Sequence, residues 1–200
     1  MDITIERLTP ARAGDYLNFF DHERGPAFSD NPEWARCYCH YYHVAPELDW
    51  PSFTGEMNRV AMRARIETGE MEGYLAYALG EVVGWMNAQP YPKLRHACAR
   101  LRIEVPALPV PLHDAAAIVC FVVAPGHRRQ GLSRALLAAG LADLAERGIA
   151  LVDAFPWRVD ASSDATDFYH GSASMFDAAG FVPIAADERM TVMRKTLAIR

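Results

Sequence analysis

The chain has 200 residues, of which 51% are hydrophobic and 22% charged, a composition typical of a globular domain with a sizeable core. Its formal net charge of −5 argues against nucleic-acid binding, because no basic field would gather phosphates. No apolar run approaches membrane-spanning length, and the N-terminus does not resemble a signal peptide. We therefore expect no membrane partner and a cytoplasmic location, with four cysteines present as free thiols.

The first elements predicted along the chain are a strand and a helix. Residues 3–8 begin with alternating apolar and polar side chains, which predicts a half-buried strand. A helix then begins with Thr9 as N-cap and Pro10 at its first position, where proline is tolerated. Aromatic side chains between residues 16 and 20 form one face of this helix, which we expect to be in the core.

Residues 34–43 combine two thiols and two imidazoles, which raises the question of a metal site. Against zinc, Cys39 and His40 are adjacent and cannot easily both reach one tetrahedral ion. No second Cys-x-x-Cys pair completes a set with Cys37, Cys39 and His43. We therefore expect no bound metal.

The same segment is rich in aromatic side chains, and two interpretations remain open. It could be a buried aromatic segment with inert thiols. It could also form the wall of a substrate pocket, since Trp34, Tyr41 and Tyr42 offer flat apolar surfaces with polar tips.

The next segments predict a helix, a hairpin and a long connection. The helix begins at Pro51 and ends near Gly69. Two apolar runs, 74–79 and 82–87, flank a glycine turn and predict a β-hairpin. Residues 90–114 are interrupted by prolines and predict a loop or flap over the mouth of a site.

The central feature of the chain is a strand, a turn and a helix. Residues 118–123 are almost wholly apolar and β-branched, which predicts a strand covered on both faces. Pro125 ends it, and a helix with leucines on one face runs from Gly131 to Gly148. The first N–H groups of such a helix lack partners, and Arg128 and Arg129 add positive charge beside them. The turn is thus either a pyrophosphate site or a simple connection with solvated arginines.

The remaining elements complete a mixed α/β fold. Residues 150–155 predict a buried strand, 157–167 a polar loop and 172–179 a helix. Residues 181–185 and 190–197 predict a closing hairpin. The order β-α-α-β-β-β-α-β-α-β-β favours a mixed sheet with helices on both faces.

Two motifs in this half of the chain resemble a known family. Arg128-x-x-Gly131-x-Ser133 after a hydrophobic strand is similar to the acyl-CoA-binding motif of the GNAT N-acyltransferase superfamily, with Ser133 in place of Gly or Ala. The segment from Tyr169 to Gly180-Phe181 resembles the late helix of that family. The resemblance implies a GNAT-like fold with a central twisted mixed sheet of about six to seven strands.

The resemblance also implies how the chain is organised. We expect residues 1–200 to form a single GNAT-like domain, with substrate-side helices in 21–70 and the acyl-CoA-binding core in 74–200. The cosubstrate would be acetyl-CoA or another acyl-CoA, and the protein would be a monomer or homodimer. The residues expected to bind acyl-CoA are Phe121, Val122, Val123, Arg128, Arg129, Gln130, Gly131, Leu132, Ser133, Tyr169, Ser172 and Phe176.

The catalytic positions of the family are less completely matched. The backbone N–H of Phe121 is expected to stabilise the charge on the thioester oxygen. Some relatives carry a glutamate base where this chain has Ala117, and Asp114 is a nearby substitute. A tyrosine that protonates the leaving thiolate in relatives corresponds to Phe176, so Tyr169 is the phenol expected to act instead.

The sequence thus predicts an N-acyltransferase that transfers an acetyl group from acetyl-CoA to the primary amine of a small or medium-sized molecule by direct attack on the thioester. Trp34, Tyr41 and Tyr42 would bind that acceptor. The alternative is a catalytically weak acyl-CoA-binding sensor or interaction module, because the usual glutamate and tyrosine are absent.

Overall fold

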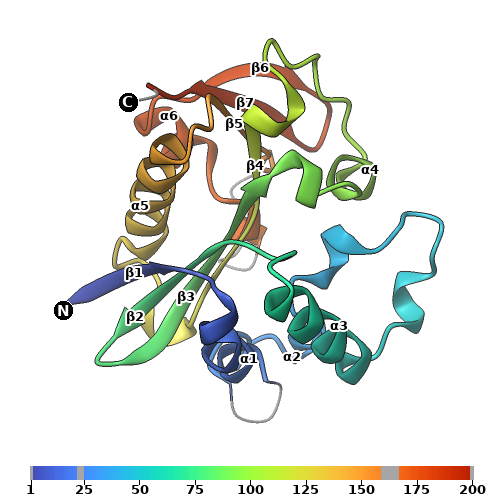
Figure 1. The fold of residues 1–200 in the computed structure, drawn as a ribbon, viewed down its shortest axis with the longest axis vertical. Helices are drawn as coiled ribbons and strands as arrows, with labels where there is room; N and C mark the ends of the chain where they lie inside the picture. Colours follow the sequence, from blue (N-terminus) through green and yellow to red (C-terminus); the bar gives the residue numbers. More distant parts are fainter. Residues whose placement is uncertain (1, 22–24, 159–166, 199–200) are drawn as a thin grey trace.

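The computed structural model describes residues 2–21, 25–158 and 167–198. One sheet of seven strands runs through the molecule in the order β1-β2-β3-β4-β5-β7-β6 (Figure 1). Neighbouring strands are antiparallel except for β4 and β5, which are parallel. The strands are β1 Ile3–Arg7, β2 Tyr74–Ala78, β3 Glu81–Pro90, β4 Ala115–Val123, β5 Leu151–Ala154, β6 Val182–Ala186 and β7 Thr191–Thr196.

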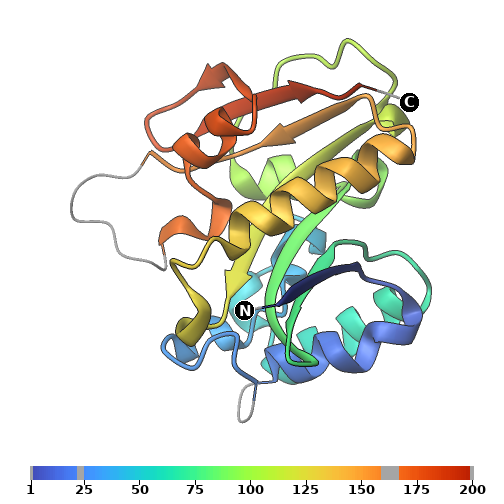
Figure 2. The ribbon, with the colours of Figure 1, turned by 90° about the vertical axis from the view of Figure 1, so that its left-hand side faces the viewer.

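Helices cover both faces of this sheet, which confirms the predicted fold class (Figures 1 and 2). Helices α1 and α3 lie on one face, and α5 and α6 lie on the other. The α-helices are α1 Ala13–Phe20, α2 Pro32–Ala35, α3 Gly55–Glu67, α4 Ala97–Leu101, α5 Leu132–Glu146 and α6 Ala173–Ala178. Short 3-10 turns include η2 His40–His43, η3 Trp50–Ser52, η5 Leu112–Asp114 and η7 Asp167–His170. The polar loop predicted at 157–167 lies largely outside the described residues.

Aromatic packing fixes α1 on its face of the sheet. The Tyr16 ring meets Trp85 of β3 edge-on, with 5.0 Å between ring centroids. Phe20 packs against Tyr16 at 4.7 Å, and the three side chains are fully buried. Such pairs add about 0.5–1.5 kcal/mol each beyond the area that they bury. The predicted core face of this helix is therefore correct.

Close contact with the sheet fixes α5 on the opposite face. Leu136, Leu137 and Leu144 are buried as the periodicity predicts. A side chain at Gly140 would begin 2.3 Å from the Met86 methyl group on β3, so glycine lets the helix approach the sheet without displacing that methyl group. This packing holds the first turn of α5 next to the end of β4.

Of two predicted helix starts, the first is correct in position and the second is wrong. Thr9 is the N-cap and Pro10 the first residue of a 3-10 turn, Pro10–Arg12, that leads directly into α1 at Ala13, although Thr9 makes no side-chain cap hydrogen bond. Helix α3 begins at Gly55 rather than at Pro51, because Thr54 Oγ1 accepts a hydrogen bond from the Met57 N–H at 3.2 Å. Proline at the start of a short 3-10 turn gave the same sequence signal as proline at the start of a helix.

The prediction of a flap over residues 90–114 is also wrong. This segment contains α4, and Leu94, Ala97 and Leu101 are buried in the core. Arg194 of β7 donates hydrogen bonds to the carbonyls of Pro106 and Ala107, each at 3.1 Å. The prolines therefore shape a packed connection that is anchored to the sheet.

Strands β4 and β5 separate after Ile118 of β4. They pair from Ala115 to Ile118 on β4, where β5 ends, while β4 continues to Val123. On its other edge β4 pairs with β3, and a register shift leaves Val119 without a partner residue there. Such a bulge bends the strand away from its neighbour. The final residues of β4 thus present an edge that β5 does not cover.

Candidate active site

Two cavities open on either side of the free end of β4. The first, here called the α5 groove, has a volume of about 720 Å³ and is lined by β4, the turn before α5 and the 168–175 segment. The second, the aromatic cavity, has a volume of about 640 Å³. Four residues line both: Phe28, Trp34, Val122 and Tyr169. A ligand in the groove would therefore meet a ligand in the cavity at the end of β4.

The α5 groove ends at the first turn of helix α5. Gly131 is the N-cap residue, with a φ of 84°, and the space where its side chain would lie is empty. The Ala135 N–H is the donor to the Gly131 carbonyl at 3.0 Å, so the N–H groups of the preceding residues of this turn have no helical acceptor. These groups and the partial positive charge of a helix of 15 residues favour a bound anion.

The arginine side chains around this turn differ in whether they are paired with a carboxylate. Arg128 forms a bidentate ion pair with Asp30 and also donates from Nε to the Val123 carbonyl at 3.0 Å. Among the described residues, no carboxylate pairs with Arg129 or Arg134, which also line the groove. Arg128 therefore braces the turn against β4, while the other two leave positive charge available.

Most of the residues expected to bind acyl-CoA line this groove. They are Phe121, Val122, Val123, Arg128, Arg129, Gly131, Leu132, Ser133, Tyr169 and Ser172. Gln130 instead lies outside, where its amide donates to the Gly126 carbonyl at 3.0 Å. Phe176 is fully buried between the rings of Phe121 and Phe181, so the structure corrects the prediction of a cofactor contact there.

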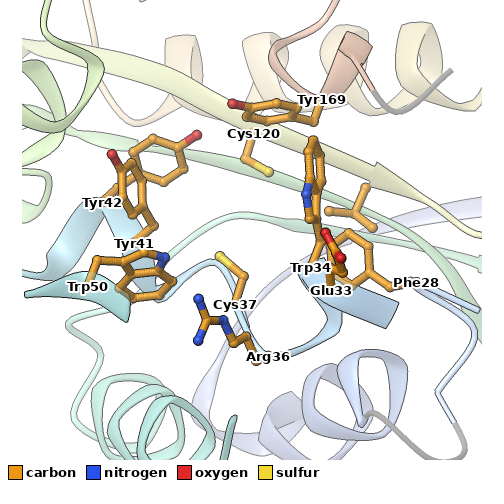
Figure 3. Close-up of a pocket in the computed structure, with 11 residues that line it drawn as sticks. Phe28, Glu33, Trp34, Arg36, Cys37, Tyr41, Tyr42, Trp50, Cys120 and Tyr169 are labelled. Atoms are coloured by element: carbon orange, nitrogen blue, oxygen red, sulfur yellow. The ribbon is translucent and has the colours of Figure 1, made fainter. Parts of the chain in front are cut away.

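The aromatic cavity contains the three residues expected to bind an acceptor, Trp34, Tyr41 and Tyr42. Figure 3 shows Tyr41, Tyr42 and Trp50 on one side and Trp34 on the other. The Tyr41 ring meets both Tyr42 and Trp50 edge-on, at 5.4 and 5.2 Å. The segment 34–43 combines both interpretations in position: Tyr38 and Cys39 are in the core, while Trp34, Tyr41 and Tyr42 line a cavity.

Tyr169 lies where the two cavities meet. Its ring contacts Trp34 edge-on at 4.9 Å and the His170 ring at 4.2 Å. His170 is buried against the rings of Tyr42 and Trp157, and this burial lowers its pKa to about 3. The neutral His170 ring thus packs η7 against its surroundings next to Tyr169.

Two thiols face the aromatic cavity, Cys37 and Cys120. A hydrogen bond to Cys39, together with burial, raises the pKa of Cys120 well above its ordinary value. Burial and the neighbouring Cys39 raise the pKa of Cys37 to about 12. Both groups therefore stay protonated near neutral pH and are poor nucleophiles.

The remaining side chains of the Cys/His segment are directed to separate partners. His40 Nδ1 lies 2.8 Å from Asn58 Oδ1, and His43 Nε2 lies 3.4 Å from Gln89 Nε2. Burial lowers the pKa of His43 to about 3. In the described part of the chain, no three His, Cys, Asp or Glu side chains gather as a metal site would require.

Asp114, expected to act as a base, lies at the wrong end of β4. It precedes the first residue of the strand, and its carboxylate is 3.4 Å from His113 at the surface. An extended chain rises ~3.3 Å per residue, so roughly 17 Å separate Ala115 from Cys120. Ala117, the position of the family glutamate, is fully buried. The geometry removes Asp114 from the site.

The cavity also contains residues that the sequence analysis did not assign to a site. Phe28, Arg36, Trp50 and Cys120 line it. The position of Trp50 near an aromatic run was the one feature of the sequence that could have indicated a place in the cavity. Its contact with Tyr41, however, depends on how residues 43–50 fold back. Nothing in the local sequence distinguishes Arg36 from other surface arginines.

Splayed central strands and a glycine-capped helix turn beside a second cavity fit the acyltransferase class of enzymes. Residues 29–171 match the model of the acetyltransferase (GNAT) family, and the chain belongs to that family. No curated protein matches the chain.

Solved structures share this fold at low sequence identity. The PaiA N-acetyltransferase from Thermoplasma acidophilum, in complex with coenzyme A, is 13% identical with a TM-score of 0.55, covering 98% of this chain and 99% of that one. A GNAT-family acetyltransferase from Streptococcus pneumoniae is 14% identical with a TM-score of 0.54, covering 98% and 100%. An N-acetyltransferase from Staphylococcus aureus is 11% identical with a TM-score of 0.53, and both chains are covered completely. Within the described residues, no helix has the length and apolar character to cross a membrane.

Proposed function

We propose that this protein is an N-acetyltransferase that uses acetyl-CoA and a small or medium-sized primary amine, with the amine attacking the thioester directly. The observation that carries the proposal is the junction at Val122 and Tyr169, where the α5 groove meets the aromatic cavity. The groove suits a long phosphate-bearing molecule, and the cavity suits a second, apolar one.

The residues of the groove fit coenzyme A. The open cradle at Gly131 and the unpaired N–H groups of the α5 turn would hold the pyrophosphate. The uncovered edge of β4 from Phe121 to Val123 would pair with the pantetheine arm as an added strand does. A thioester placed there supplies an acyl group that is ready for transfer.

Groups near the junction have distinct roles in this proposal. The Phe121 N–H stabilises the negative charge that develops on the thioester oxygen. The Tyr169 phenol donates a proton to the departing thiolate. Glu33, which lines the cavity next to Trp34, holds the incoming amine as a cation before it loses a proton.

Direct attack is favoured over transfer through an enzyme thiol. Cys37 and Cys120 are the two thiols of the cavity, and both remain protonated near neutral pH for the reasons given above. A protonated thiol is a poor acyl acceptor compared with an amine held at the same place.

An acyl-CoA-binding module with little turnover is the second candidate. It is favoured by the buried Ala117 and Phe176, which stand where relatives carry a base and an acid. Such a module would use the same groove but would not need the aromatic cavity to be occupied.

The test combines binding and turnover. We expect calorimetry to show CoA binding, and release of free CoA from acetyl-CoA to depend on an added amine that contains an apolar or aromatic body. Initial rates measured against both substrates should give intersecting lines, as expected when both must be bound before transfer. CoA binding without acetylation of any amine in a broad panel would favour the module, and parallel lines would indicate an acyl-thiol intermediate.

A further inference from the structure

The aromatic cavity contains two opposite charges that do not neutralise each other. Among its described lining residues, Arg36 is the single cation and Glu33 the single anion (Figure 3). They lie three positions apart, at and just after the short helix α2, where side chains are about 5–6 Å apart at their Cβ atoms. Neither is ion-paired with any described residue. Two unpaired, opposite charges on one wall are complementary to a ligand that carries both signs.

The guanidinium of the half-buried Arg36 lines the cavity. Figure 3 shows it next to Cys37, below the rings of Tyr41 and Trp50. Its one hydrogen bond within the described residues is from Nη1 to the Pro51 carbonyl at 3.2 Å. Most of its five donor groups thus remain available, in a planar arrangement that suits a carboxylate.

The backbone of Arg36 is held by a buried polar pair. Asn58 of α3 is fully buried and donates to the Arg36 carbonyl at 2.8 Å. Its amide oxygen lies 2.8 Å from His40 Nδ1, so both ends of the amide are engaged. A buried amide with both ends satisfied fixes the peptide that carries Arg36. The backbone that carries the Arg36 side chain is therefore held in a defined position.

Glu33 is closer to the junction than Arg36. Figure 3 shows it beside Phe28 and Trp34, which line both the groove and the cavity. An amine held near Glu33 would be next to the end of β4, and a carboxylate on the same ligand, directed along the wall, would face Arg36. The aromatic rings of Tyr41, Tyr42 and Trp50 then face the rest of the ligand.

We propose that the acceptor is a free α-amino acid with an aromatic or large apolar side chain, whose carboxylate binds Arg36. The inference rests on the acetyltransferase function proposed above. Its chemistry is the attack of the α-amine nitrogen on the thioester carbon, which forms an amide bond, breaks the carbon–sulfur bond and transfers the amine proton so that CoA leaves as a thiol. Arg36 is a specificity-determining residue that does not touch the reacting atoms.

The test compares amino acids with the same molecules lacking the carboxylate. L-Phenylalanine is paired with phenethylamine, and L-tryptophan with tryptamine, and kcat/KM is measured for each. The wild-type protein should favour the amino acid of each pair. In Arg36→Gln this preference should fall by about 10- to 100-fold, the loss expected when a charged hydrogen bond is removed. Arg36→Lys, which keeps the charge but not the planar fork, should give an intermediate preference.

Arg95→Gln is the matched control. Arg95 also donates to a proline carbonyl, that of Pro92 at 3.2 Å, but it does not line the cavity. Its replacement should leave the preference unchanged. A wild-type enzyme that acetylates the amines and rejects the amino acids would overturn the proposal, as would an unchanged preference in Arg36→Gln.

Binding separates this inference from the proposed function. Calorimetry of L-phenylalanine in the presence of CoA should show an affinity that weakens by about 10- to 100-fold in Arg36→Gln. If CoA binds and no amine is acetylated, the enzymatic function fails, but this loss of affinity would still support an amino-acid site. Absence of amino-acid binding to the wild-type protein contradicts the inference whatever the turnover.

Discussion

At the scale of single residues, the chain has Ala117 and Phe176 at the two positions where the resemblance to the GNAT family leads us to expect a base and an acid. Phe176 occupies the place of a tyrosine and is fully buried among other rings. Tyr169, which lies beside His170 and Trp34, is the phenol at the junction of the two cavities. From the burial of Phe176 and the position of Tyr169, we propose Tyr169 as the source of the proton for the thiolate.

We predict that Tyr169→Phe lowers kcat by about 100-fold, the lower range for loss of a general acid, because no other phenol lines both cavities among the described residues. CoA affinity should change little, since the ring remains. Tyr41→Phe serves as control because its hydroxyl donates to the Arg100 carbonyl at 3.3 Å, away from the junction. Steady-state kinetics with saturating substrates provide the measurement, and an undiminished kcat in Tyr169→Phe would rule this residue out as the acid.

Phe176→Tyr is not expected to restore the missing acid. A hydroxyl added there enters a fully buried site and costs about 1–3 kcal/mol if it finds no partner.

At the scale of elements, the function depends on how β4 ends and α5 begins. The strand leaves β5 after Ile118, and the turn delivers the chain to a glycine N-cap with a φ of 84°. Most residues strongly disfavour this backbone conformation. The same glycine leaves the space beside the turn open. Glycine therefore meets two requirements at once: the positive φ of the turn and the room for the proposed phosphates.

We predict that Gly131→Glu abolishes measurable CoA binding, because the new side chain strains the turn and places negative charge in the phosphate cradle. Gly126→Glu is the matched control in the same connection: its φ is ordinary and the space around it is open. Calorimetric titration with CoA should show near wild-type affinity for the control. Equal affinities in the two variants would mean that the turn does not bind the phosphates.

At the scale of the whole molecule, several imidazoles are buried in neutral form between the sheet and the helices that cover it. Burial lowers the pKa of both His43 and His170 to about 3. In the unfolded chain these groups would take up protons near their ordinary pKa of about 6.5. The unfolded state thus binds more protons below that pH, and stability falls as the pH drops from about 6.5 towards 3.

We predict that His170→Phe reduces this pH dependence. Each such histidine removes about 1.4 kcal/mol per pH unit in that window, so the variant should lose about 2 kcal/mol less than wild type between pH 7.5 and 5.0. His113→Phe is the control, since the His113 side chain is 77% exposed and is solvated in both states. Urea unfolding at the two pH values measures the difference. Identical losses in wild type and His170→Phe would show that this ring does not titrate with unfolding.

The sequence by itself determined the order of the strands and of the longer helices, but not the short helices α2 and α4, and it brought together most residues of the α5 groove. Alternation along β1, the apolar run of β4 and the leucine spacing of α5 are local patterns, and burial follows them directly. Arg128, Gly131 and Ser133 are close in sequence, so their shared place in the α5 groove needed no knowledge of distant contacts.

Only the tertiary structure completed the aromatic cavity, for which the sequence had indicated Trp34, Tyr41 and Tyr42. Phe28, Arg36 and Trp50 meet Cys120 and Tyr169 across separations that no local pattern encodes. Asp114 was excluded because a strand carries its two ends far apart, although both ends are near in sequence. Whether an arginine lines a cavity depends on which chain segments pack opposite it. The packing of the whole core around the sheet decides this, and the neighbouring residues in the sequence do not.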